Sequence, residues 1–289
     1  MLREFVIFTL LTLMLMGLGY LVGLFIGSPE VLTLFALIVA SLMNLLAYFY
    51  GDSLVLKMTN AKLIDKSKAP RLYRIVEKVS QKMNLPTPKI GIVPTLSPNA
   101  FATGRDPQHS IVCVTEGALR LLDDEELEGV IGHELSHIKH RDTLIASIAA
   151  TLVGALSYIA FIGRYALFFG TGERREANPA GLLLFLIGLI FIPIAAVLLQ
   201  MAISRGREFY ADEESAKVTE KPLSLASALQ KIEKAVKHGY TIKANPATSH
   251  LWISNPFSGD LMAELFSTHP STRRRIERLK LIARELGQL

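Results

Sequence analysis

The chain has little cysteine and little charge, and both shortages limit what it can be. Its one cysteine, Cys113, excludes an intrachain disulfide and lies in an apolar run typical of a small core residue. Charged residues make up only 20% of the 289 positions, half of the positions are hydrophobic, and the mean hydropathy is +0.35. This balance argues against an ordinary soluble protein and predicts membrane spans beside one globular domain.

Charge is absent from four long stretches of the chain. Residues 5–27 and 31–50 are each long enough to cross a hydrocarbon core of roughly 30 Å, and the short turn between them predicts a helical hairpin. Residues 143–163 and 180–203 are uncharged as well. We expect a second apolar hairpin there; the alternative is a pair of buried or partly inserted helices.

The distribution of lysine and arginine predicts the orientation. Basic residues are dense from 57 to 74 and absent from the first turn, so the positive-inside rule places the soluble segments 52–142 and 204–289 in the cytoplasm. The chain is therefore divided into a transmembrane hairpin (1–51), a first catalytic part (52–142), a second hairpin (143–203) and a second catalytic part (204–289). One group of charges then falls outside the cell, against the rule: Arg164, Arg174 and Arg175.

The net charge of +5 could suggest a nucleic-acid partner. Most basic residues lie beside apolar spans, where they set membrane orientation, so we expect a lipid bilayer and no nucleic acid. A nucleic-acid or lipid-binding module stays open as an alternative.

The soluble segments predict a small sheet with helices. Apolar positions at three-and-four spacing predict a helix over residues 70–83. Short apolar runs between turn residues predict strands at residues 89–93, 99–104 and 110–115.

The most informative motif is the sequence H-E-x-x-H at residues 133–137. Asp123 and Glu126 match an acidic form of the capping box and predict the start of a helix that carries it. On that helix, His133 and His137 lie on one face and can bind one zinc ion, while Glu134 can deprotonate the attacking water.

Catalytic zinc needs a third protein ligand. Residues 204–212, just after the last apolar stretch, contain Glu208 and Asp212 four positions apart, which places both on one helical face. One carboxylate could bind the metal while the other supports a ligand.

Four blocks in this order resemble those of the HtpX-type membrane zinc metalloproteases, in the family that also contains the Ste24-type CaaX prenyl proteases. The resemblance covers nearly the whole chain. Its blocks are Asn99-Ala100-Phe101-Ala102; His133-Glu134-x-x-His137 with Asp142; Arg207-Glu208-Phe209-x-Ala211-Asp212; and His269-Pro270 with Arg275-Ile276.

The resemblance implies a role for each matched residue. Glu208 would be the third ligand of a single zinc ion, and Asp142 and Asp212 would orient ligands. His269 and Arg275 would face the substrate or the developing oxyanion. Residues 99–104 would form an edge strand that pairs with an extended substrate, through Asn99, Ala100, Phe101 and Ala102.

We therefore predict a mainly α membrane protein: four long apolar helices with a cytoplasmic zincin-like α+β catalytic domain and a small β-sheet. The predicted function is zinc-dependent hydrolysis of damaged or misassembled proteins in the cell membrane. A CaaX prenyl-protein protease and a catalytically silent zinc-binding scaffold stay open as competing hypotheses. Residues 238–260 match no motif; they could form a flap or a substrate-docking element.

The position of the motif adds one expectation. Its two histidines precede the second hairpin and Glu208 follows it, so the zinc should lie close to the cytoplasmic membrane surface. Disturbing residues 143–203 should then loosen the metal.

Overall fold

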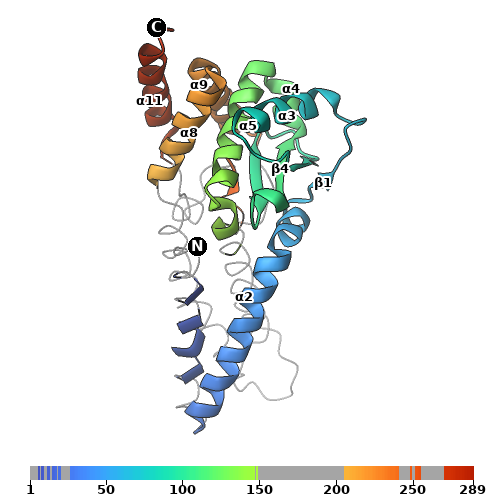
Figure 1. The fold of residues 1–289 in the computed structure, drawn as a ribbon, viewed down its shortest axis with the longest axis vertical. Helices are drawn as coiled ribbons and strands as arrows, with labels where there is room; N and C mark the ends of the chain where they lie inside the picture. Colours follow the sequence, from blue (N-terminus) through green and yellow to red (C-terminus); the bar gives the residue numbers. More distant parts are fainter. Residues whose placement is uncertain are drawn as a thin grey trace. The chain divides into compact units, whose positions relative to one another are not determined.

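The computed structural model describes a defined part of the chain, drawn in Figure 1. The described positions are several among residues 6–20, then 27–146, 148, 205–240, 248, 251–254 and 270–289. They divide into two compact units, Met1–Gly51 and Asp52–Leu289. Apart from residues 143–146 and 148, the expected second hairpin lies outside the described residues, as does His269.

The first unit is helical. Its described positions among residues 6–20 are helical. Helix α2 (Pro29–Thr59) follows; it starts with proline, whose missing N–H costs nothing there, and its residues 52–59 belong to the second unit. Within the described ranges, α2 is the one helix long and apolar enough to cross a membrane. The Asn44 side chain donates a hydrogen bond of 3.0 Å to Thr12 Oγ1 and so joins the two helical segments.

The second unit contains one mixed sheet with strand order β1-β2-β4-β3. Its strands are β1 (Lys62–Leu63), β2 (Lys89–Val93), β3 (Ala100–Gly104) and β4 (Ser110–Thr115). Strand β2 is parallel to β4, and the other two pairs are antiparallel. The three longer strands confirm the sequence prediction, which missed the two-residue β1. Strand β3 is the last in the order and is therefore an edge strand.

Six described α-helices and the short 3₁₀ helix η1 (Pro107–His109) also belong to this unit. Helix α3 (Pro70–Lys82) buries the apolar face that its spacing predicts. Helix α5 (Asp124–Lys139) carries the H-E-x-x-H motif, and the predicted capping box of Asp123 and Glu126 is present. The other helices are α4 (Glu116–Leu121), α8 (Arg205–Thr219), α9 (Pro222–Lys237) and α11 (Thr272–Glu285).

Helix α5 is the centre of the unit. It packs against α8 and α9, and also against α3 and the strands β3 and β4, as Figure 1 shows. Glycine allows the close approach of α8. A Cβ atom at Gly132 would lie 2.5 Å from Ser215 Oγ and 3.2 Å from Thr219 Cγ2, and Ser215 Oγ donates to the Gly129 carbonyl at 2.7 Å.

This packing predicts the effect of a larger residue at position 132. In Gly132→Leu, the side chain should force α8 away from α5 and lower the free energy of unfolding by about 1–3 kcal/mol, as overpacking does. Thermal unfolding of the purified protein would measure the loss. The matched control is Gly17→Leu, because nothing lies within 4 Å of a Cβ at Gly17; equal melting temperatures for the two variants would contradict the prediction.

Candidate metal centre

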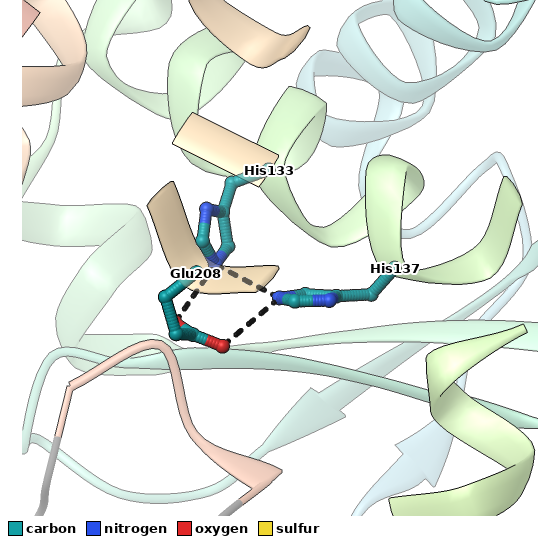
Figure 2. Close-up of side chains that lie close together, drawn as sticks. All are labelled: His133, His137 and Glu208. Atoms are coloured by element: carbon teal, nitrogen blue, oxygen red, sulfur yellow. Dashed lines mark hydrogen bonds and ion pairs between the residues drawn. The ribbon is translucent and has the colours of Figure 1, made fainter. Parts of the chain in front are cut away.

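The two histidines of the motif present the same ring nitrogen to one point. They are four positions apart on α5, and their Nε2 atoms lie 3.2 Å from each other. Figure 2 shows both rings directed at the carboxylate of Glu208, which comes from α8. The helical spacing brings the histidines together, whereas the packing of α8 on α5 adds the glutamate.

These three groups fit one tetrahedral metal ion. Glu208 Oε1 lies 3.3 Å from His137 Nε2, and Glu208 Oε2 lies 3.6 Å from His133 Nε2. Ligand atoms about 2.0–2.2 Å from a tetrahedral zinc ion lie roughly 3.3–3.6 Å apart. All three donors lie within 4.8 Å of one another, so they can share one ion and leave a fourth position for water or substrate.

A carboxylate lies behind each histidine. Asp212 Oδ1 is 2.9 Å from His133 Nδ1, and Asp142 Oδ2 is 3.2 Å from His137 Nδ1. An acid that accepts the Nδ1 proton leaves the Nε2 lone pair for a metal and holds the ring in place. Asp142 in turn forms an ion pair with Arg207.

Arg275 lies among these acids with only 2% of its side chain exposed. Its Nε and Nη2 donate to the two Asp212 oxygens at 2.8 and 2.7 Å, and its Nη1 donates to the Ile253 carbonyl at 2.7 Å. The guanidinium is also 3.8 Å from Glu208 Oε2. These contacts place Arg275 beside the groups that hold the candidate ligands. Its role opposite a developing oxyanion stays a prediction.

Glu134 is buried next to the three candidate ligands. It lines a small cavity of about 30 Å³ together with them, which is room for one or two water molecules. The apolar wall of this cavity includes Leu251, Trp252 and Ile253, which come from the stretch 238–260 that matches no sequence motif. The full lining is Ala102, His133, Glu134, His137, Asp142, Thr143, Ala146, Glu208, Leu251, Trp252 and Ile253.

The residues of the predicted edge strand differ in what their side chains contact. Ala102 lines the cavity. Phe101 is fully buried and packs edge-on against Trp252, with ring centroids 4.9 Å apart. The Asn99 side chain is engaged with the backbone of Ser254.

The surrounding charges shift the protonation of the centre. Burial and Arg275 lower the pKa of His133, but Asp212 and Glu208 outweigh them and raise the pKa above its ordinary value. Burial likewise lowers the pKa of His137, but the nearby Glu208 outweighs this effect and raises the pKa above its ordinary value. Burial alone would raise the pKa of Asp212, but Arg275 and His133 hold it below its usual range.

The comparisons with known proteins point to one kind of enzyme. Residues 66–283 match the model of peptidase family M48. The chain is 48% identical over 285 residues to a "Protease HtpX homolog" of Pyrococcus furiosus, covering 99% of this chain and 96% of the relative. A protein of the same name from Aquifex aeolicus is 47% identical over 279 residues, covering 95% of this chain and 90% of the relative.

Among solved structures, the crystal structure of S. mikatae Ste24p is similar with a TM-score of 0.49 at 18% identity. The match covers 84% of this chain and 57% of that one.

The raised pKa of both histidines predicts how metal affinity depends on pH. Because a protonated imidazole cannot bind, and because the carboxylates keep it protonated above the ordinary pKa of about 6.5, metal binding must release protons near neutrality. Affinity should rise as the pH is raised through about 6.5 and beyond it. Competition with a chelating dye across this range would measure it, and a flat profile would contradict the prediction.

The contact behind His133 gives a second prediction. Asp212→Asn should weaken metal binding about 10–100-fold, because the ring loses the negative charge of its acceptor and Arg275 loses its counter-ion. Dialysis against metal buffers would measure the dissociation constant. The control is Glu213→Gln, at the neighbouring position, whose carboxylate bonds Lys217; equal losses in both variants would refute the role of Asp212.

Proposed function

The chain belongs to peptidase family M48 and is a membrane metalloprotease, and from this premise we propose that its metal is zinc, held by His133, His137 and Glu208. The observation that carries the proposal is the spacing of these three donors around one point. Two imidazoles and one carboxylate form a ligand set that favours zinc in catalytic sites, and the fourth position is free for chemistry.

Each residue of the centre has a proposed part in hydrolysis. When bound, zinc acts as a Lewis acid towards the scissile carbonyl and makes water acidic near neutrality. Glu134 accepts the proton of the attacking water and donates it to the leaving amine. Asp142 and Asp212 hold the rings of His137 and His133. His269 would face the substrate, as its match to the family pattern implies.

The substrates we propose are damaged or misassembled membrane proteins. An extended segment would pair with the edge strand β3 near the cavity, and this mode recognises the backbone more than the side chains. A folded protein offers no such segment, so pairing of this kind selects unfolded chains.

We further propose a multi-pass arrangement in the cell membrane. Four apolar segments, at residues 5–27, 31–50, 143–163 and 180–203, would cross the bilayer. The two parts of the catalytic domain, 52–142 and 204–289, would face the cytoplasm. The support for this arrangement is the absence of charge from these segments and the basic residues that follow them.

One experiment separates this proposal from the competing hypotheses. The protein is purified in detergent, its zinc content is measured, and cleavage of casein is followed with and without a chelator. We expect about one zinc per chain and cleavage that the chelator abolishes. A farnesylated CaaX peptide cleaved in place of casein would favour a prenyl-protein protease, and zinc without any cleavage would favour a scaffold.

Glu134→Gln tests the mechanism itself. The amide cannot accept the proton of water, so casein cleavage should fall by at least about 10²–10⁴-fold, while the zinc content stays that of the parent protein. Zinc analysis and a cleavage assay on the same preparation measure both quantities. Normal cleavage by this variant would refute the assigned base.

A further inference from the structure

The edge of β3 that faces away from the sheet is formed by alternate residues. Asn99 pairs with Thr115, because the Thr115 N–H donates to the Asn99 carbonyl at 3.0 Å. In an antiparallel pair such positions alternate, so with the register Ala102↔Val112 the backbone groups of residues 100, 102 and 104 point outward. An incoming strand could bond only to these three residues.

The first of the three is already paired. A short segment lies against the start of β3 and is here called the edge segment. It consists of Leu251, Trp252, Ile253 and Ser254. The Ile253 N–H donates to the Ala100 carbonyl at 2.9 Å, and the Ala100 N–H donates to the Asn99 side chain at 3.1 Å. Both backbone groups of Ala100 are therefore occupied.

The carbonyl of the last of the three, Gly104, is bonded as well. The Thr143 hydroxyl donates to the Gly104 carbonyl at 2.9 Å. Gly104 has a φ of +129°, a backbone conformation that a side chain would strain, and the strand ends there. Across the ranges that the structure describes, Ala102 is left as the one outward residue with neither its N–H nor its carbonyl bonded.

The edge segment is held too firmly to act as a loose flap. The Asn99 side chain both donates to the Ser254 carbonyl at 2.8 Å and accepts from the Ser254 N–H at 3.3 Å. Arg275 bonds the Ile253 carbonyl. Trp252 and Ile253 are 0% and 1% exposed, and exposing two such apolar side chains opposes displacement.

We infer that the edge segment and Thr143 shorten the substrate-pairing edge of β3 to Ala102 alone. One substrate residue, opposite Ala102 at the cavity, would donate its N–H to the Ala102 carbonyl and accept the Ala102 N–H. This inference rests on the proposed protease function and makes it more specific. It also gives Asn99 a different role from the predicted substrate contact: Asn99 holds the edge segment.

The test scans the substrate backbone. A peptide that the zinc-loaded protein cleaves at one mapped bond is resynthesised with a single N-methyl group at each amide in turn, omitting the scissile amide. The wild-type protein should lose about tenfold or more in kcat/KM for one methylated residue, and should tolerate methylation two residues to either side. Loss at amides spaced two apart would show that the edge is longer and would overturn the inference.

A variant should lengthen the edge by one pairing position. Thr143→Val removes the hydroxyl and frees the Gly104 carbonyl. Because the pairing is antiparallel, a second sensitive amide should appear two residues towards the amino end of the substrate. The matched control is Thr59→Val, since the Thr59 hydroxyl bonds only within α2; its scan should equal that of the wild type. An unchanged scan for Thr143→Val would count against the inference.

The two proposals can fail separately. If the zinc-loaded wild-type protein cleaves no peptide or casein, the protease proposal fails. If it cleaves and its scan shows alternating sensitivity, the protease proposal stands and the single-residue edge is wrong.

Discussion

The candidate metal centre depends on the close packing of α8 against α5. Two candidate ligands come from one helix and the third from the other, so the geometry of the metal site is set by the distance between the two helix axes. Gly132 lacks the side chain that would collide with Ser215 and Thr219 of α8, and the Ser215 hydroxyl donates a hydrogen bond to the Gly129 carbonyl of α5. In this close packing, Glu208 Oε1 lies 3.3 Å from His137 Nε2.

Arg275 compensates part of the negative charge that this packing buries. Asp212 and Glu208 are both buried carboxylates, and desolvation makes such a pair costly without positive charge nearby. Arg275 comes from α11, and it neutralises Asp212 through two hydrogen bonds. A bound divalent ion would add the positive charge that the buried carboxylate of Glu208 requires. Thus α11, although it supplies no candidate ligand, is tied to both the centre and the edge segment.

The sequence predicted those parts of the structure that depend on short-range patterns. Helical spacing placed His133 and His137 on one face, and Asp123 with Glu126 marked where that helix begins. By contrast, the spacing of Glu208 and Asp212 left their roles open, because only packing decides which carboxylate meets the histidines. The edge segment could not be foreseen either. Its contacts join residues about 150 positions apart in the chain, such as Asn99 and Ser254. Helical or strand periodicity cannot predict contacts between such distant positions.

A short pairing edge and a broad range of substrates are compatible on physical grounds. One pair of backbone hydrogen bonds contributes only about 1–3 kcal/mol, so this pairing alone holds a substrate weakly. Confinement of enzyme and substrate to one membrane raises the effective concentration and lowers the affinity that binding needs. Under the proposed function, discrimination would then come from access. A segment must be extended and must reach Ala102 beside the cavity, and a well-folded membrane protein exposes no such segment.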